Sequence, residues 1–376
     1  MQNKIFRKPI ILISLVLSFL NFSFVTAQDC NTSFRGNQAL TGVSNVQTSK
    51  SYKLLATFKT GDAIKSSAIL CNENIYFGSN DGFIYSISKT GKLNWKYNAG
   101  TSIDASPLLL DNTIYVGSLE GYIFAIDSKT GKLKWKYKTD GQISGSANWA
   151  VSADKKQKNI IIGSYDYNLH CINSLTGKNV WKYESGNYIN GTAAISNNIA
   201  VFGGCDGFLH LVDINNGKSK DKININSYIA SSVAIDGNKA YLGNYDGELF
   251  CIDLISKKTL WKISGFGTFI SSPSLYANYL IINSQDKNVY CLNKLTGKTI
   301  WKFATLQKIE SSPVIAGKSV VITSNDGRIY ILDLTTGNKI WSYEIGSPVK
   351  TTPYVTNDLI IVGADDGKVY IFKGNK

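Results

Sequence analysis

The stretch "GSNDGFIYSISKTGKLNWKY", residues 78–97, decides the fold, because it holds two tight-turn signals between short β-type segments. It recurs at 117–138 as "GSLEGYIFAIDSKTGKLKWKYK". Asp-Gly tolerates positive φ at both central positions and joins antiparallel strands tightly. The "KTGK" stretch supplies a second turn that again uses glycine. The repetition therefore indicates an array of antiparallel hairpins.

Tryptophan marks the period of this repeat. The tryptophans at the equivalent place are 40, 46, 80, 40 and 40 residues apart: Trp95, Trp135, Trp181, Trp261, Trp301 and Trp341. The gap of 80 hides one further unit, in which Asp221 stands at the tryptophan position. Each unit has four short segments of β-branched and aromatic residues, and such a unit of about 40 residues is typical of a β-propeller blade.

The number of units predicts eight blades. The second strand of a unit and its turn meet at Gly78, Gly117, Gly163, Gly203, Gly243, Asn283, Thr323 and Gly363. The chain stops after the third strand of the last unit, whereas "YKLLATFKTGDAIKSSA" near the N-terminus aligns with an outer strand and the inner strand that follows it. We therefore expect an all-β fold: an eight-bladed β-propeller of four-stranded antiparallel blades, closed by residues 53–58 as the outer strand of the last blade.

Two units lack the glycine of the first turn. Tyr167 and Lys287 replace it, and the next residue is Asn168 or Asn288. Because asparagine is the next-best residue for the left-handed conformation, we expect these turns to be rebuilt one position along, at the asparagine.

The N-terminus reads as an export signal. Basic residues precede an apolar run from Ile10 to about Val25, and small residues end at Ala27. We therefore assign 1–27 to a signal peptide, 28–50 to an N-terminal segment and 51–376 to the propeller; an uncleaved membrane anchor is the alternative. Cleavage removes three cations and lowers the net charge from +13 to 13 − 3 = +10. That charge favours acidic partners or surfaces, while the scattered lysines do not favour nucleic acid.

The units resemble those of the pyrroloquinoline-quinone (PQQ) repeat propellers. The closest match is "AIDSKTGKLKW" at 125–135, and "FRGNQALTGVS" at 34–44 resembles the segment before the propeller in many bacterial members. The resemblance implies that the six repeat tryptophans dock each blade on its neighbour. It is specific for the fold and not for the function, since one fold can host unrelated activities.

Two classes of function share this propeller: quinoprotein dehydrogenases, which hold PQQ and calcium on the axis, and BamB-like scaffolds of outer-membrane protein assembly. The units here are nearly uniform; six extra residues near 152–159 are the main insertion, and the chain has neither an adjacent cysteine pair nor CxxCH. We therefore expect a non-catalytic, BamB-like interaction scaffold in the cell envelope, without a cofactor. The alternatives are a quinoprotein dehydrogenase and a secreted carbohydrate- or peptide-binding propeller.

The expected partners and location follow from this interpretation. We expect envelope or outer-membrane proteins as partners, no nucleic acid, peripheral membrane association and a monomer. The protein should lie in the periplasm or at the outer membrane, with secretion from the cell as the alternative. The sequence names no individual partner.

Charged residues are expected at the mouth of the central channel. Each inner strand starts with an apolar residue, one variable residue and then small residues; the charged variable residues are Lys65, Asp104, Glu310 and Lys350. They fall in blades one, two, seven and eight, and so on one side of the mouth. They either bind a small polar ligand or a peptide, or pair with one another.

Histidines and cysteines offer no metal site. His170 and His210 take a position held by Tyr85 and Phe124 elsewhere, so we interpret them as aromatic packing substitutes. Cysteines 171, 251 and 291 share one register and are expected to be buried free thiols. Segment 28–50 could run past the turn that holds Cys71. The sequence leaves two alternatives open: Cys30 and Cys71 form a disulfide, or both remain free thiols.

The two kinds of turn place opposite charges on the two faces. Asp-Gly turns put an acid in every blade on one face, where the acid also serves the turn itself. Thr-Gly-Lys turns put lysines on the other face, which we call the lysine face. A basic face of this kind can attract an acidic protein or an anionic membrane surface.

Overall fold

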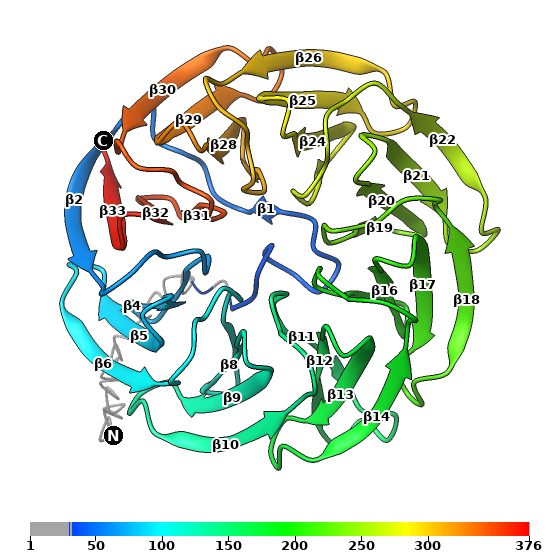
Figure 1. Cartoon of the computed structure of the whole chain (residues 1–376). Helices are drawn as coiled ribbons and strands as arrows, with labels where there is room; N and C mark the ends of the chain where they lie inside the picture. The colour runs from blue at the N-terminus through cyan, green and yellow to red at the C-terminus, as the bar shows by residue number, and fades with distance from the viewer. Residues whose placement is uncertain (1–29, 31, 376) are drawn as a thin grey trace, which may run out of the picture.

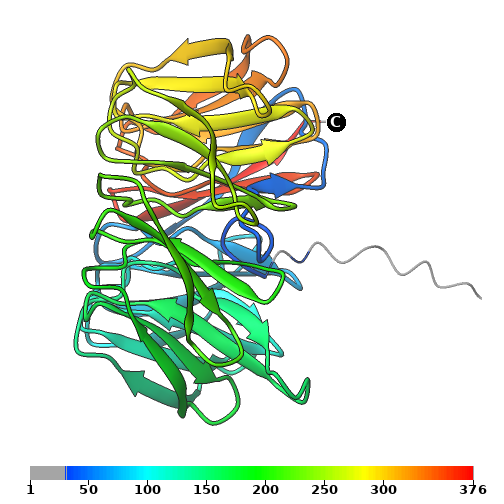
Figure 2. The same ribbon diagram turned by 90° about the vertical axis from the view of Figure 1, so that its right-hand side faces the viewer.

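Eight four-stranded sheets stand around a central axis in the computed structural model, which describes residues 30 and 32–375 (Figures 1 and 2). The predicted signal peptide, 1–27, lies outside the described residues and stays a prediction. Within the described range, no helix is long and apolar enough to cross a bilayer. We number the blades along the chain, from blade one (β3–β6) to blade eight (β31–β33 with β2).

The inner and second strands are short and mostly buried. The inner strands are β3 (Ile69–Cys71), β7 (Leu108–Leu110), β11 (Asn148–Val151), β15 (Ala194–Ser196), β19 (Ala234–Asp236), β23 (Ser274–Tyr276), β27 (Val314–Ala316) and β31 (Tyr354–Val355). The second strands are β4 (Asn74–Gly78), β8 (Thr113–Gly117), β12 (Lys158–Gly163), β16 (Ile199–Gly203), β20 (Lys239–Gly243), β24 (Tyr279–Asn283), β28 (Ser319–Thr323) and β32 (Leu359–Gly363).

The third strands are buried and the outer strands alternate between exposed and partly covered residues. The third strands are β5 (Phe83–Ser88), β9 (Tyr122–Asp127), β13 (Asn168–Asn173), β17 (Phe208–Asp213), β21 (Leu249–Asp253), β25 (Asn288–Asn293), β29 (Arg328–Asp333) and β33 (Lys368–Gly374). The outer strands are β6 (Leu93–Asn98), β10 (Leu133–Lys138), β14 (Asn179–Glu184), β18 (Ser219–Asn224), β22 (Thr259–Ile263), β26 (Thr299–Ala304), β30 (Lys339–Glu344) and β2 (Tyr52–Lys59).

The N-terminal strand closes the ring, as the sequence predicted. β2 pairs antiparallel with β33 from Tyr52↔Gly374 to Lys59↔Lys368, which makes it the fourth strand of blade eight. The predicted strand 53–58 is thus one residue short at each end. A second N-terminal strand, β1 (Val43–Ser44), adds parallel to β27 and makes that sheet five-stranded. The prediction of eight blades is confirmed.

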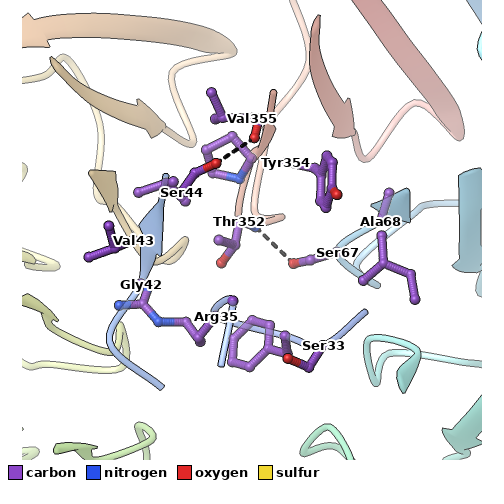
Figure 3. A pocket seen from close by; sticks show the side chains of 15 residues that line it. Ser33, Arg35, Gly42, Val43, Ser44, Ser67, Ala68, Thr352, Tyr354 and Val355 are labelled. Atoms are coloured by element: carbon purple, nitrogen blue, oxygen red, sulfur yellow. Dashed lines mark hydrogen bonds between the residues drawn. The ribbon is translucent and has the colours of Figure 1, made fainter. Parts of the chain in front are cut away.

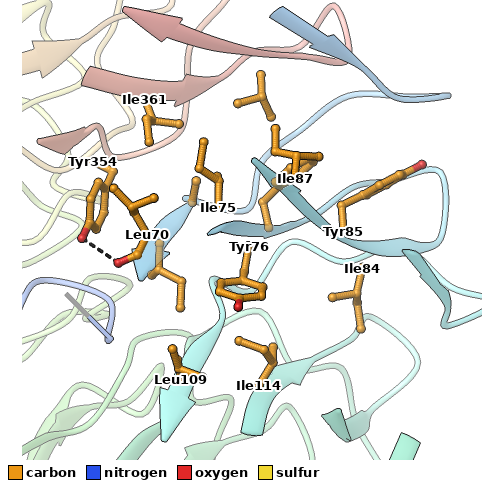
Figure 4. Packing of buried hydrophobic residues seen from close by; sticks show 14 of the residues in the cluster. Leu70, Ile75, Tyr76, Ile84, Tyr85, Ile87, Leu109, Ile114, Tyr354 and Ile361 are labelled. Carbon is orange, nitrogen blue, oxygen red and sulfur yellow. Dashed lines mark hydrogen bonds between the residues drawn. The ribbon is translucent and has the colours of Figure 1, made fainter. Parts of the chain in front are cut away.

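The core lies between neighbouring blades, because the middle strands are apolar on both of their faces. Figure 4 shows Leu70 and Ile75 of blade one between Ile361 of blade eight and Ile114 of blade two. These four side chains are fully buried. Each sheet is therefore covered by its two neighbours, and closure of the ring leaves no sheet face without a partner.

The prediction for the two turns without glycine was wrong. Positive φ occurs at Tyr167 (70°) and Lys287 (74°) themselves, the same position that Gly82 (87°) holds in blade one. In blade three, Asp166 Oδ1 accepts the backbone N–H of Asn168 at 3.0 Å, and Asn168 Nδ2 donates back to the Asp166 carbonyl at 2.7 Å. Asn168 thus stabilises the turn by hydrogen bonds, although Tyr167 and not Asn168 adopts the left-handed conformation.

Repeat tryptophans dock blades on one another. The indole N–H donates to a backbone carbonyl of the next blade at 2.9–3.1 Å in five blades: Trp95 to Ser128, Trp135 to Ser174, Trp181 to Ile214, Trp261 to Lys294 and Trp301 to Leu334. The turn glycine of that next blade lies under the ring. A Cβ on Gly131 would come within 2.7 Å of the Trp95 indole, so glycine is needed there for close approach as well as for its φ of 70°.

Three seams depart from this pattern, and in the one between blades eight and one Ala56 stands at the tryptophan position. Trp341 has no turn to dock on, because the chain ends within blade eight; its ring instead packs at 5.6 Å on Tyr52. Between blades four and five, Asp221 replaces the tryptophan and Lys257, at φ 61°, replaces the glycine. Asp221 and Lys257 form an ion pair across the seam. Two departures from the repeat that lie 36 residues apart are thus one substitution of an indole–glycine contact by a salt bridge.

Candidate interaction site at the channel mouth

The N-terminal segment seals one end of the axial channel. Carbonyls of the segment accept the amide N–H of inner-strand residues at 2.7–3.0 Å: Thr32 from Leu109, Gln38 from Ile195, Ala39 from Ile235, Thr41 from Leu275 and Gly42 from Ile315. Side chains reach two more blades, since Gln38 Nε2 donates to the Trp149 carbonyl at 2.7 Å and Ser44 Oγ to the Val355 carbonyl at 2.8 Å. Figure 1 shows this segment crossing the centre of the ring.

A disulfide attaches the same segment to the remaining blade. Cys30 and Cys71 lie 2.04 Å apart at sulfur, and Cys71 ends the inner strand of blade one. The segment therefore contacts all eight blades on the end of the axis where the first hairpins and the Thr-Gly-Lys turns lie. Cys171, Cys251 and Cys291 are buried free thiols, as predicted.

Arg35 anchors the segment, a role that the sequence analysis did not predict. Its guanidinium is buried and donates to the carbonyls of Pro273 at 2.5 Å and Pro313 at 2.7 Å, and to Ser274 Oγ at 2.9 Å. Burial lowers the pKa of Arg35 to about 9. Gly42 lies against the guanidinium, where a Cβ would clash with Nη2. Pro273 and Pro313 precede the inner strands of blades six and seven, so one side chain fixes the segment to both.

Little space remains beneath this seal. The cavity in Figure 3 lies between the segment and blades eight and one, and its volume is about 40 Å³. Arg35, Val43, Ala68 and Tyr354 line it, so it is mainly apolar. A space of this size holds one or two water molecules at most.

A closed circle of hydroxyls surrounds the axis above the seal. One serine or threonine per blade uses its hydroxyl oxygen to accept the backbone N–H of its counterpart in the preceding blade, at 2.9–3.2 Å: Ser67, Ser106, Ser146, Thr192, Ser232, Ser272, Ser312 and Thr352. The circle closes because the N–H of Thr352 donates to Ser67 Oγ. Small side chains fit this crowded position near the axis by size alone. The structure shows that the hydroxyl is also needed, since it pairs an otherwise buried N–H.

The four charged residues predicted at the mouth line one cavity of about 170 Å³ at the open end of the axis. Lys65 Nζ lies 3.5 Å from Asp104 Oδ2, so these two pair with each other. Glu310 pairs at 2.5 Å with Lys308, outside the predicted set. Lys350 likewise pairs with Asp365 at 2.6 Å. Sequence reasoning missed Lys308 and Asp365, although both stand in loops that open on the mouth.

Tyrosines flank the mouth on the other side. We call the end of the axis with the Asp-Gly turns the mouth face. On blades three to five it carries Tyr165, Tyr188, Tyr228 and Tyr245, of which the last three are well exposed. Tyr165 and Tyr188 stack with centroids 4.8 Å apart. The mouth face therefore has a charged half and an aromatic half.

The two histidines belong to the packing, as predicted, and they also make polar contacts. Both are fully buried, and His210 stacks on Phe202 at 4.9 Å. His170 Nε2 lies 3.0 Å from Asp166 Oδ2, and its Nδ1 lies 3.2 Å from Tyr137 Oη of blade two. Elsewhere a tyrosine hydroxyl bonds the turn aspartate, as Tyr85 does with Asp81 at 2.6 Å. Histidine thus makes the same hydrogen bond to the turn aspartate as tyrosine does, and it also fills a similar space.

The residues on the axis do not fit a PQQ–calcium centre. A pocket that encloses a ligand of that size has about 300–1,000 Å³, whereas the cavity here has about 170 Å³. Lys65 and Lys350 line this cavity, and both are already paired with aspartates rather than free for an anionic ligand. Among residues 30 and 32–375, no three His, Cys, Asp or Glu side chains are grouped to hold a metal ion.

These features define a class: an eight-bladed PQQ-type propeller with one sealed end and one narrow, polar mouth. A family model described as "Outer membrane protein assembly factor BamB" matches residues 80–303 and 285–375. The chain therefore belongs to the BamB family of PQQ-repeat propellers. No curated protein matches it.

Solved structures share the fold at low sequence identity. BamB from Moraxella catarrhalis superposes with a TM-score of 0.73 at 18% identity, over 86% of this chain and 100% of that chain. The quinohemoprotein alcohol dehydrogenase of Comamonas testosteroni gives 0.78 at 13%, over 93% and 81%. A europium-containing methanol dehydrogenase gives 0.78 at 12%, over 92% and 98%. BamB and the two dehydrogenases superpose with similar TM-scores of 0.73 to 0.78, so the fold does not decide between a scaffold and an enzyme.

Proposed function

We propose that this protein is a non-catalytic interaction scaffold of the cell envelope that acts in outer-membrane protein assembly. The sealed axis carries the proposal: the N-terminal segment fills one end, and the other end holds a cavity of about 170 Å³ whose charges are paired. Such an axis leaves the exposed faces of the ring, rather than its interior, as the place for partners. Membership of the BamB family supports the same function.

The mouth face is the surface that we assign to a protein partner. Exposed tyrosines next to a charged rim match the composition of protein interfaces, in which aromatic anchors are enriched. Tyr188, Tyr228 and Tyr245 lie on loops of three consecutive blades. A partner that covers blades three to five can therefore bury all three.

Site-specific photocrosslinking tests the assignment. A photoreactive residue at Tyr245, on the mouth face, should crosslink in cells to a component of the outer-membrane assembly machinery. The same residue at Tyr276, which is similarly exposed on the lysine face, serves as the matched control. Crosslinks from position 276 and none from position 245 would show that the partner uses the other face.

The enzyme alternative has its own test. The purified protein is incubated with PQQ and calcium, and the bound quinone is measured by absorbance after gel filtration. We expect no stoichiometric quinone and no alcohol-dependent dye reduction. One bound quinone per chain with such activity would overturn the scaffold function. Loss of outer-membrane β-barrel proteins after deletion of the gene would support it.

A further inference from the structure

Three turns on the lysine face carry an exposed aliphatic side chain at the tip. Leu175, Ile255 and Leu295 are 72%, 70% and 55% exposed. They occupy one register position in blades three, five and six. Polar residues fill that position in the sister blades: Lys129, Asn215 and Thr335. The fold therefore builds the same turn without an apolar tip.

The backbone of these turns is held by hydrogen bonds that do not involve the tip side chains. Asn173 Oδ1 accepts the backbone N–H of Leu175 at 3.0 Å and of Thr176 at 2.9 Å. Asn293 Oδ1 accepts the N–H of Leu295 at 3.0 Å in the same way. The backbone of the tip is thus satisfied by the capping side chain. Because the cap in blades three and six is asparagine rather than aspartate, these two turns also have no negative charge.

A second apolar residue accompanies each tip. Val180, Leu260 and Ile300 are the second residues of the outer strands after the three turns and are exposed as well. In blades two and four, where the tip is polar, the equivalent residues are Lys134 and Lys220. Blade seven does not follow the correlation, because its polar tip Thr335 precedes an exposed Ile340; blades three, five and six combine an apolar tip with an apolar second residue.

An exposed lysine follows three residues after each tip: Lys178, Lys258 and Lys298. Neighbouring Lys220 pairs with Asp213, whereas these three lysines form no ion pair with any carboxylate among residues 30 and 32–375. Each of the three turns therefore presents a protruding aliphatic side chain beside an unpaired positive charge.

We infer that the lysine face docks on the surface of an anionic phospholipid bilayer, with the three aliphatic tips inserted at the headgroup level. Aliphatic side chains that protrude among lysines combine apolar insertion with attraction to acidic headgroups. The tips belong to three separate blades on one end of a ring, so a broad, flat partner can touch them all at once. Charge complementarity selects an anionic surface.

Vesicle sedimentation tests the inference. The protein is expressed for export, purified as the cell processes it, and mixed with phosphatidylethanolamine–phosphatidylglycerol vesicles or with neutral phosphatidylcholine vesicles. We expect binding to the anionic vesicles that weakens in high salt, since salt screens exposed charges. The variant with Leu175→Ser, Ile255→Ser and Leu295→Ser should have an affinity for the anionic vesicles that is at least about ten-fold lower. The variant with Lys178→Glu, Lys258→Glu and Lys298→Glu should lose binding to a similar degree.

Matched controls come from the mouth face. Leu306 is 62% exposed there, so Leu306→Ser removes an equally exposed leucine and should leave vesicle binding unchanged. Lys287→Glu is the control for charge. All variants should keep the far-UV CD spectrum and thermal midpoint of the wild type. Absence of wild-type binding to anionic vesicles would overturn the inference, and so would wild-type affinity in the triple serine variant or an equal loss in Leu306→Ser.

Discussion

The seam between blades four and five should become more stable when it receives the tryptophan and glycine of its sister seams. Asp221 and Lys257 form an ion pair where five other seams place an indole on a glycine. The double substitution Asp221→Trp with Lys257→Gly rebuilds that contact. Its indole N–H would reach the carbonyl of Leu254, the equivalent of Ser128 beneath Trp95.

The magnitude follows from what each contact buries. The side chains of Lys257 and Asp221 are 48% and 29% exposed, and a pair this exposed contributes about 0–1 kcal/mol. A docked indole buries about 150–250 Å², which at about 25 cal/mol per Å² amounts to about 4–6 kcal/mol as an upper bound. After subtraction of the ion pair and of the surface that it already covers, the double variant should gain about 2–4 kcal/mol of unfolding free energy.

The single substitutions should behave differently. Asp221→Trp alone should destabilise, because the new indole would clash with the Cβ of Lys257. At the equivalent place in the first seam, a Cβ added to Gly131 would lie only 2.7 Å from the Trp95 indole. Lys257→Gly alone removes the strain of a φ of 61°, worth about 1–2 kcal/mol, but leaves Asp221 without its partner. Lys257→Gly alone should therefore gain about 0–2 kcal/mol of unfolding free energy, whereas Asp221→Trp stabilises only when Lys257→Gly accompanies it.

Urea unfolding followed by far-UV CD measures all four proteins in a double-mutant cycle. We expect a coupling free energy of at least about 2 kcal/mol in favour of the double variant. Trp181→Asp combined with Gly217→Lys runs the exchange in reverse, and its loss of unfolding free energy should be smaller than the sum of the losses in the two single variants. The docking explanation fails if the free energies add within about 0.5 kcal/mol, or if the double variant is less stable than the wild type.

Three further outcomes are expected. Ser232→Ala should lower the unfolding free energy by about 1–3 kcal/mol in urea unfolding, because the buried N–H of Thr192 loses its acceptor; Ser232→Thr should not. Cys71→Ser opens a crosslink that spans 41 residues, so the thermal midpoint should fall by an amount that corresponds to about 4 kcal/mol, and a reducing agent should then have no further effect. Burial raises the pKa of the Asp166 carboxyl, but the hydrogen bond and charge of His170 outweigh burial and lower that pKa to about 2. The unfolding free energy of the wild type should therefore exceed that of Asp166→Asn above pH about 5, and the difference should vanish as pH falls from about 4 to about 2. A difference that persists at pH 2 would contradict this assignment.

The architecture was predictable because the repeat states each structural requirement several times. Asp-Gly and Thr-Gly-Lys fix both turns of nearly every unit, and the alternation of residues between them fixes which side of each outer strand is covered. The missing fourth strand of the last unit pointed to the N-terminus, where Ala56 stands at the tryptophan position. In the structure Ala56 lies against Gly91 of blade one, where an added Cβ would come within 3.3 Å of the Ala56 methyl group, as the repeat requires.

Contacts between units were not predictable from one unit at a time. The Asp221–Lys257 pair appears in the sequence as two unrelated exceptions. An alignment of the units does not show that the outer strand of one blade covers the Thr-Gly-Lys turn of the next. Lys350 pairs with Asp365 rather than with another predicted mouth residue for the same reason. Both pairs depend on how loops from different strands meet in space.

The hydroxyl circle left a signal that we interpreted too narrowly. All eight positions are serine or threonine, and none is alanine or glycine, which would serve equally well if size alone mattered. The hydroxyl oxygen pairs the N–H of the preceding blade, so side-chain chemistry and not volume selects the residue. A small-residue position that never contains alanine indicates a hydrogen bond.

The two proposals place their partners at opposite ends of the axis, and this makes them testable together. The N-terminal segment seals the end that carries the lysine face, whereas the exposed tyrosines and the paired charges lie around the mouth. A bilayer on the lysine face would therefore direct the mouth face away from the membrane, toward a protein partner. Membrane vesicles and the crosslinked partner at Tyr245 should bind the same molecule at once, without competition. If the partner displaces the vesicles, the two surfaces overlap and one of the two faces has been assigned incorrectly.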